Sequence, residues 1–326
     1  MFDYTSVIAI LPERLGDSLF HTPSLRTIKL LRPQIKLGVV ALSPLCAEVL
    51  RNNPYIDAVY VLPNERETAR LATNYDVTLL LHTHAAARKY ADWLGLETIA
   101  INSPASPRHW SRHSLEFTCS LLGADPQSVD AGYDLSPDPT NFTAIDRLLA
   151  ESGASADDIL IGCHIGCHSI AKRGLKFWRS LTHPKVWPFE NFVALEKKLR
   201  AINPRIRFVL TGSQGEKQLG NKFIKRAPHS INLIDKTSVL DLAALMDSLA
   251  LFITSDTGAM HVACAREVGV IALWGPTDLN VTGPYPMRDN YRILQKQSLT
   301  DLSVDEVTAV LIDHPSLHAQ KQMESA

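Results

Sequence analysis

The chain has 326 residues, of which 45% are hydrophobic and 21% charged, the balance of a globular protein with room for two domains. The formal net charge of −1 gives no basic field that would favour nucleic acid as a partner. No apolar run approaches the roughly 20 residues of a membrane span, and the N-terminus lacks the basic start of a signal peptide. We therefore expect a cytoplasmic protein that binds no nucleic acid, and a peripheral membrane contact stays open.

Short apolar, β-branched runs alternate with longer amphipathic segments in the N-terminal part of the chain. Strands separated by helices of this length form βαβ units and a mostly parallel sheet, so an α/β domain is expected. The expected strands are residues 6–11, 35–42, 57–62, 77–82 and 97–101, with helices near 17–32, 44–52, 65–73 and 85–94.

The alternation breaks at residues 125–140, which are rich in Pro, Asp, Ser and Gly and are expected to form a linker. A second alternating series follows, so the chain divides into an N-terminal domain, 1–150, and a C-terminal domain, 151–326. Whether the final helix packs back on the N-terminal domain stays open. The expected strands of the second series are 158–164, 206–212, 229–234, 250–255 and 268–275, with helices near 140–152, 188–202, 214–226, 238–249, 257–267 and 301–313.

In open α/β sheets, ligands bind outside the carboxyl ends of the strands, so residues just after a strand are candidates for chemistry. After the strand at 250–255 come Asp256 and Thr257, which are N-cap residue types, and then Gly258. Free backbone N–H groups at such a helix start bind anions, and His261 lies on the first turns of the same helix. The structural alternative is that Asp256 only caps the helix and His261 only packs.

Two further strand-end segments carry candidate ligand groups. Glu216 follows the strand at 206–212, and its carboxylate suits the hydroxyl or amine donors of a nucleotide. Lys185 precedes a helix that Pro188 begins, and its ammonium suits a diphosphate. The structural alternatives are an ordinary turn at Glu216 and a solvated surface lysine at Lys185.

The first strand is followed by Gly16 and Asp17, in the stretch AILPERLGDSLFHTP. A carboxylate repels phosphate, so we expect the anionic ligand in the C-terminal domain instead. Asp17 is then a candidate to accept the proton of a substrate hydroxyl, and its structural alternative is a helix N-cap.

The five cysteines are odd in number and irregular in spacing, which disfavours a disulfide framework. The run CHIGCHS, Cys163 to Ser169, looks like a metal or haem motif. Its cysteines lie one residue too far apart for haem attachment, and no second ligand pair follows for zinc. A strand end that runs into a loop is the preferred interpretation, so no metal is expected.

Two segments resemble signatures of the lipopolysaccharide heptosyltransferases, the ninth family of glycosyltransferases. SDTGAMHVACA…GVIALWGPTD…TGPY is similar to the C-terminal signature of the family, and ILPERLGDSLFHTPSLRTIKLLRPQIKLGVV to its N-terminal one. The resemblance implies a GT-B fold, in which two Rossmann-like βαβ domains face each other across a cleft. It also implies inverting transfer of heptose from ADP-heptose to a sugar hydroxyl of the lipopolysaccharide inner core, without a cofactor or metal. That acceptor is a glycolipid, so peripheral contact with the bacterial inner membrane stays open.

The resemblance also implies a role for each matching residue. Asp17 matches the general base of the family, in an acceptor-binding N-terminal domain. The residues that match the donor-binding set lie in the C-terminal domain: Gly166, Cys167, Lys185, Glu216, Asp256, Thr257, Gly258 and His261. The link before Lys185 is longer than is usual in the family, which leaves Lys172 and Arg173 as rival ligands of the diphosphate.

Alternative functions remain at this point. The enzyme could use another nucleotide sugar or another acceptor, or it could be a hydrolysing nucleotide-sugar epimerase, which shares the two-domain architecture. A nucleotide-sugar-binding protein without activity is the non-enzymatic alternative. A dehydrogenase is disfavoured because no G-x-G-x-x-G sequence follows any expected strand.

Overall fold

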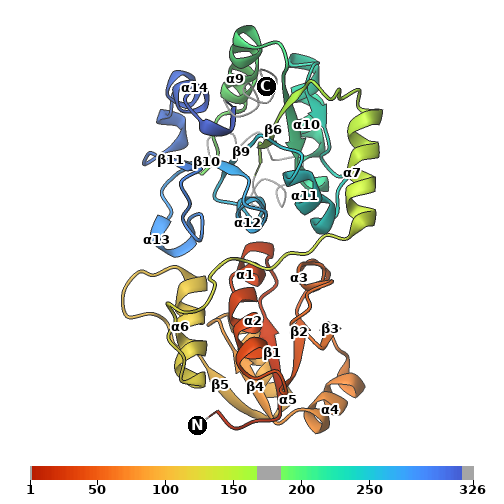
Figure 1. The fold of residues 1–326 in the computed structure, drawn as a ribbon, viewed down its shortest axis with the longest axis vertical. Coiled ribbons are helices and arrows are strands. Elements are labelled where there is room, and N and C mark those ends of the chain that lie inside the picture. Colours follow the sequence, from red (N-terminus) through yellow and green to blue (C-terminus); the bar gives the residue numbers. More distant parts are fainter. Residues whose placement is uncertain (1, 167–184, 318–326) are drawn as a thin grey trace. The chain divides into compact units, whose positions relative to one another are not determined.

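Two compact units make up the chain, and the computed structural model describes residues 2–166 and 185–317 of it (Figure 1). The first unit comprises residues 1–136 and 280–286, and the second comprises 137–279 and 287–326. The expected boundary at residue 150 differs from this division because α7 (Pro139–Glu151) belongs to the second unit. There Asn141 Nδ2 donates a hydrogen bond to Asp241 Oδ1 at 2.7 Å.

A parallel sheet forms the core of the first unit, with the strand order β3-β2-β1-β4-β5. Val7 in β1 pairs with Leu37 on one side and with Val77 on the other, so the strand order reverses beside β1. All six residues of β1 are buried, as expected for a central strand covered on both faces. The strands are β1 (Ser6–Leu11), β2 (Lys36–Ala41), β3 (Ala58–Val61), β4 (Val77–Leu80) and β5 (Glu97–Ala100).

The helices of the first unit differ from the expectation at two places. The expected helix at 17–32 is divided into α1 and α2, and Pro23 in the first turn of α2 lacks the N–H that a continuous helix would need. Helix α6 was not expected, because its buried face includes polar residues such as Ser111 and Ser114 and so has weak hydrophobic periodicity. The helices are α1 (Leu15–Leu19), α2 (Thr22–Leu31), α3 (Pro44–Leu50), α4 (Glu65–Asn74), α5 (Ala85–Leu94) and α6 (Trp110–Leu122).

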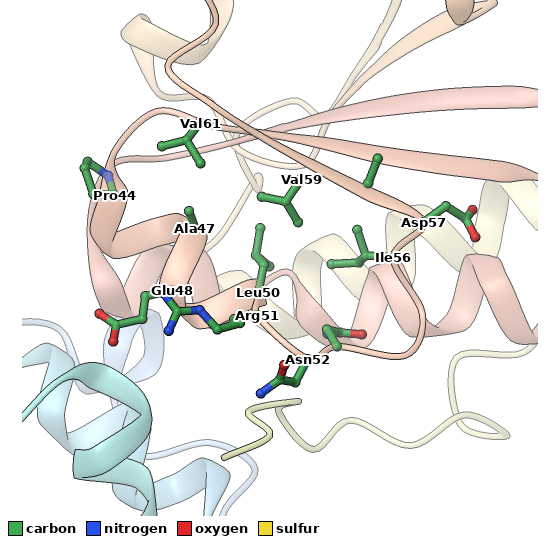
Figure 2. Close-up of a pocket in the computed structure, with 12 residues that line it drawn as sticks. Pro44, Ala47, Glu48, Leu50, Arg51, Asn52, Ile56, Asp57, Val59 and Val61 are labelled. Carbon is green, nitrogen blue, oxygen red and sulfur yellow. The ribbon is translucent and has the colours of Figure 1, made fainter. Parts of the chain in front are cut away.

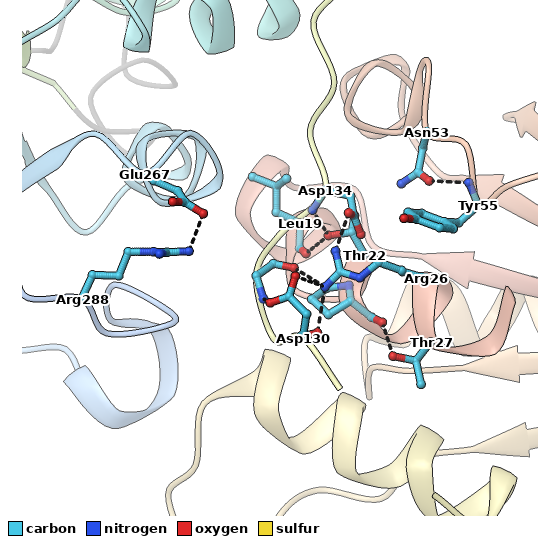
Figure 3. Close-up of polar contacts among 12 residues, drawn as sticks. Leu19, Thr22, Arg26, Thr27, Asn53, Tyr55, Asp130, Asp134, Glu267 and Arg288 are labelled. Atoms are coloured by element: carbon cyan, nitrogen blue, oxygen red, sulfur yellow. Dashed lines mark hydrogen bonds and ion pairs between the residues drawn. The ribbon is translucent and has the colours of Figure 1, made fainter. Parts of the chain in front are cut away.

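The expected linker is fixed to the first unit by a buried arginine of α2. Arg26 donates to the carbonyl oxygens of Asp130 and Gly132 at 2.7 and 2.9 Å, and also to the carboxylate of Asp134 (Figure 3). Burial raises the pKa of Asp134 to about 6, against the lowering influence of Arg26. The chain is therefore held against α2 just before it enters the second unit at Pro137.

Residues 280–286 join the first unit from far along the sequence. His109 Nε2 lies 3.1 Å from the carbonyl oxygen of Gly283, and the imidazole stacks on Tyr285 with ring centroids 4.4 Å apart. The Tyr285 ring also lies near Tyr133, at a centroid distance of 6.1 Å. This segment thus contributes an aromatic side chain to the packing of the first unit.

The second unit is built on another parallel sheet, with the order β11-β10-β9-β6-β7-β8. Gly162 in β6 lets this strand pack closely, since a Cβ there would lie 2.5 Å from side-chain atoms of Leu249 and Phe252. The expected strand at 229–234 is reduced to two residues in β8, and β11 was not expected. The strands are β6 (Ile159–His164), β7 (Ile206–Thr211), β8 (Ile231–Asn232), β9 (Leu251–Ser255), β10 (Gly269–Trp274) and β11 (Tyr291–Gln295).

The final described helix, α14 (Val304–Ile312), begins with the capping box that Ser303 and Glu306 predict. It packs against α9 within the second unit, where Lys198 pairs with Asp305 at 2.5 Å. No helix in the described ranges is long and apolar enough to cross a membrane. The other helical segments from Lys185 onward are α9 (Phe189–Ile202), η2 (Gln214–Glu216), α10 (Lys217–Arg226), α11 (Val239–Met246), α12 (Gly258–Ala265), α13 (Leu279–Thr282) and η3 (Leu299–Asp301).

Candidate functional site

The strand order of each sheet reverses once, and such a switch point is where open α/β sheets bind ligands. In the second unit the reversal lies between β6 and β9, because β7 and β8 follow on one side of β6 while β9, β10 and β11 lie on the other. Four of the predicted donor-binding residues follow these two strands directly: Gly166 after β6, and Asp256, Thr257 and Gly258 after β9.

Lys185 and Asp256 form an ion pair at this edge of the sheet. Lys185 Nζ lies 3.1 Å from Asp256 Oδ2, and the side chains are 35% and 16% exposed. The carboxylate thus holds the ammonium beside the start of α12. Lys172 and Arg173, the rival cations, lie outside the described residues, as does Cys167.

The start of α12 offers backbone donors to an anion. Thr257 is the N-cap residue, but its side chain makes no capping hydrogen bond to the helix. Thr257 Oγ1 is instead within 3.0 Å of Thr254 Oγ1. The N–H groups of the first turn are therefore not capped by Thr257, which is the arrangement that helix-start anion sites use.

Glu216 lies in a tight polar setting beside two glycines. Its carboxylate accepts hydrogen bonds from the backbone N–H and the hydroxyl of Ser213, at 2.7 and 2.9 Å, and the residue is 3% exposed. A Cβ on Gly166 would lie 2.0 Å from Glu216 Oε1, and one on Gly212 would lie 2.9 Å from Oε2. Only glycines therefore leave room for the carboxylate at this place.

His164, the last residue of β6, is a partner of Glu216 that sequence reasoning left without a role. Its Nε2 lies 3.5 Å from Glu216 Oε1, and its Nδ1 lies 3.3 Å from Thr211 Oγ1. Burial raises the pKa of Glu216, but His164 and the hydrogen bonds from Ser213 outweigh burial and leave the pKa below its usual value. Glu216 is thus a carboxylate at neutral pH.

His261 lies on α12 with 3% of its surface exposed. Burial lowers the pKa of its imidazole to about 3, so the ring is neutral at physiological pH. A contact between this side chain and a donor stays a prediction.

In the first unit, the strand order reverses between β1 and β4. Asp17 is half-buried in the first turn of α1, which follows β1. His82 and His84 follow β4 at the same edge of the sheet. The structure therefore brings the predicted base into a region that contains several imidazoles.

The rings at this edge form a connected group. The centroids of His21 and His82 are 5.6 Å apart, and those of His82 and His84 are 6.2 Å apart. Trp110, the first residue of α6, stacks on His82 at 4.1 Å. Sequence reasoning did not select these residues, although the run His82-Thr83-His84 at the end of an expected strand was a usable signal.

Two basic residues near the start of α6 are engaged within the first unit. Arg108 and Arg112 both pair with Glu116, the latter at 2.8 Å. Their charges are therefore partly neutralised by a neighbouring carboxylate rather than gathered into a basic patch.

A hollow of about 620 Å³ lies between α3 and β3 in the first unit (Figure 2). Glu48, Arg51 and Asp57 provide charged groups at its walls, and Val59 and Val61 provide apolar surface. None of the predicted site residues lines this hollow.

Across residues 2–166 and 185–317, no group of three or more His, Cys, Asp or Glu side chains is arranged to hold a metal ion. Cys163 of the CHIGCHS run is buried in β6, and burial raises the pKa of its thiol well above the usual value. This cysteine is thus part of the core of the second unit.

Comparison with known proteins gives a family match for part of the chain. Residues 178–309 match the sequence model of glycosyltransferase family 9 (heptosyltransferase). This part of the chain is similar to that family. This match confirms the predicted resemblance to the family and supports the prediction of a glycosyltransferase.

Curated relatives match over a limited part of their length. Lipopolysaccharide heptosyltransferase 2 of Salmonella typhimurium is 30% identical over 105 residues, which are 31% of this chain and 30% of the relative. The enzyme of the same name from Escherichia coli K12 shows the same identity and coverage. The sequence match therefore spans about a third of the length of these relatives.

Solved structures match over nearly the whole chain. A family 9 glycosyl transferase from Veillonella parvula has a TM-score of 0.79 at 19% identity, covering 94% of this chain and 96% of its own. The E. coli ADP-heptose lipopolysaccharide heptosyltransferase II has a TM-score of 0.73 at 19% identity, covering 98% and 100%. These likenesses confirm the predicted α/β fold class, with two Rossmann-like domains.

Proposed function

We propose that the protein is an inverting glycosyltransferase that moves a heptose from ADP-heptose to a sugar hydroxyl of the lipopolysaccharide inner core. The family match and the curated relatives support the reaction class. The observation that carries the proposal is an arrangement suited to an anion, in which Lys185 pairs with Asp256 beside the start of α12, a helix that the Thr257 side chain does not cap. The names of the relatives support heptose as the transferred sugar.

The second unit is proposed to bind the donor. Backbone N–H groups at the start of α12 and the ammonium of Lys185 would stabilise the leaving diphosphate as its charge grows. Glu216 is a carboxylate at neutral pH, as a contact to ribose hydroxyls requires. Because Glu216 is 3% exposed, a direct contact with ribose would require the chain around it to move. The alternative is an indirect role, in which Glu216 positions His164.

The first unit is proposed to bind the acceptor, with Asp17 as general base. A sugar hydroxyl has a pKa far above 7, so the carboxylate needs to take the proton only as the new bond forms. The hydroxyl oxygen then attacks the anomeric carbon, and the bond from that carbon to the diphosphate breaks. The diphosphate leaves with the electron pair, and the configuration at the anomeric carbon is inverted.

A hydrolysing nucleotide-sugar epimerase is the main rival, and the fold does not separate it from the proposal. A putative UDP-N-acetylglucosamine 2-epimerase from Listeria monocytogenes matches this chain with a TM-score of 0.52 at 12% identity. Donor turnover in the absence of any acceptor would identify the epimerase. The family match favours the transferase.

The experiment that tests the proposal is a thermal-shift and calorimetric screen of ADP-, GDP- and UDP-sugars against the whole protein. A ligand at 100 times its Kd stabilises the folded state by about 2.7 kcal/mol. We expect ADP-heptose to give this stabilisation and the other donors to give less. Equal or greater stabilisation by a UDP- or GDP-sugar would contradict the assigned donor. Donor consumption without a lipopolysaccharide acceptor would contradict the assigned reaction.

A further inference from the structure

The imidazoles at the end of β4 are the feature of the first unit that the proposed mechanism leaves unused. His21 is completely buried, while His82 and His84 are half-buried. Three of their nitrogens have no hydrogen-bond partner within the described part of the chain: Nε2 of His21, Nδ1 of His82 and Nδ1 of His84. A buried polar atom without a partner costs free energy, so a cluster of them calls for a ligand or a special role.

The electrostatics of His21 and His82 favour neutral rings. Burial, the neighbouring His84 and the charge of Arg14 together lower the pKa of His82 to about 4. Burial and His82 hold the pKa of His21 well below its usual value. Neutral imidazoles both donate and accept hydrogen bonds, as sugar hydroxyls do, but they do not attract a phosphate as a cation would.

The rings of His21, His82 and His84 differ in the contacts that hold them in place. His21 Nδ1 lies 3.1 Å from Ser114 Oγ, and Ser114 Oγ lies 2.7 Å from Ser24 Oγ. This chain of hydrogen bonds holds the His21 ring in place. His82 stacks on Trp110, and its Nδ1 has no hydrogen-bond partner among the described residues. Because χ2 of histidine is soft, the ring can turn a nitrogen toward a ligand. His84 is the N-cap residue of α5 but makes no side-chain capping bond.

We propose that His82, His84 and Trp110 form a recognition subsite for a hydroxyl-bearing face of the acceptor sugar, beside Asp17. This subsite rests on the proposed function, because it assigns the acceptor to the first unit. The switch point between β1 and β4 places these side chains and α1 at one edge of the sheet. The indole of Trp110 supplies an apolar wall for the C–H face of a sugar ring, and the imidazoles supply partners for its hydroxyls.

The test uses the whole protein labelled with ¹³C at the histidine Cε1 positions, observed by NMR in the presence of ADP. The probe is the deacylated oligosaccharide of a lipopolysaccharide inner core that lacks heptose. We expect the signals of His82 and His84 to move when the oligosaccharide is added, and that of the exposed His229 to stay in place. The subsite is wrong if the oligosaccharide binds or is glycosylated while the signals of both His82 and His84 remain unchanged.

Variants separate recognition from folding. His82→Phe keeps a flat ring against Trp110 but removes both nitrogens, and we expect it to raise the Kd for the oligosaccharide roughly five- to tenfold while the Kd for ADP is unchanged. His82→Asn retains a polar group near Nδ1 and should bind the oligosaccharide more tightly than His82→Phe. An unchanged oligosaccharide Kd in a folded His82→Phe variant would overturn the subsite. Absence of ADP binding in the wild type would instead contradict the proposed function of the second unit.

Discussion

The two units present different kinds of polar surface at the carboxyl ends of their sheets. In the second unit, Lys185 is paired with Asp256, and Glu216 is bonded to Ser213 and approached by His164. In the first unit, one nitrogen each of His21, His82 and His84 is without a partner among the described residues. The second unit thus presents paired charges at this edge, whereas the first unit presents imidazole nitrogens that the fold itself does not satisfy.

The largest effect is expected from the first unit, at Asp17. Asp17→Asn keeps the size of the side chain but removes its basicity, so the transfer rate should fall by roughly 10²- to 10⁴-fold. Binding of ADP, measured by calorimetry, should be unchanged because the proposed donor-binding groups lie in the second unit. Near-normal turnover of this variant would show that Asp17 is not the base.

Removal of Lys185, the cation paired with Asp256, tests the proposed role of the second unit in donor binding. Lys185→Ala deletes the charge-assisted contact that we propose to the diphosphate, and such a contact is worth roughly 1.5–3 kcal/mol or about 10- to 100-fold in affinity for ADP. The matched control is Lys217→Ala, since Lys217 also pairs with an aspartate, Asp235, at 3.1 Å but is 61% exposed. Equal losses of ADP affinity in the two variants would argue against a specific role for Lys185.

A methyl group added at Gly166 should lower the stability of the second unit and leave the first unit unchanged. In Gly166→Ala the new Cβ would collide with the carboxylate of Glu216, which should cost roughly 1–3 kcal/mol of folding stability and weaken ADP binding. Gly212→Ala, where the approach is 2.9 Å, is the milder counterpart and should cost less. Urea denaturation and ADP calorimetry measure both effects, and the reverse order of the two losses would contradict the packing argument.

Acidification gives the smallest effect and tests both units together. The pKa values of His82 and His261 lie at about 4 and about 3 in the folded protein, below the 6.5 of an unperturbed imidazole. The unfolded chain therefore binds more protons as the pH falls through 6.5, and folding stability decreases. Each imidazole should contribute about 0.7 kcal/mol of destabilisation between pH 7 and pH 6.

The variant from the subsite test also isolates the contribution of His82 to this pH effect. In His82→Phe, the difference between the urea midpoints at pH 7 and pH 6 should shrink by the contribution of one imidazole. A pH dependence identical to that of the wild type would mean that His82 is not held neutral by the fold.

Sequence reasoning predicted the parts of the fold that carry strong periodicity. The all-apolar run of β1 and the capping box of Ser303 and Glu306 determine their elements locally, and both were placed correctly. Helix α6 was missed because Ser111 and Ser114 lie on its buried face, and Ser114 finds its partners, His21 and Ser24, only through the fold. Such long-range contacts leave no pattern in a single sequence.

In the candidate site too, some residues could be predicted from sequence motifs, whereas others are brought together only by the fold. Motif positions led to Asp17, Lys185 and Asp256, and the structure adds that the last two are in contact. His82 and Trp110 are separated in the sequence and come together only through the fold, so no spacing rule could have joined them. The roles of the predicted site residues stay proposals that the variants above will test.

The segment 280–286 has a consequence for how this protein can be divided. Because the first unit includes this returning piece, the polypeptide passes between the units at residues 136–137, 279–280 and 286–287. A truncation at residue 136 would remove Tyr285 and uncover the faces of His109 and Tyr133 that it covers. Separate production of the halves would therefore need the short peptide restored, either fused behind the N-terminal piece or supplied in trans.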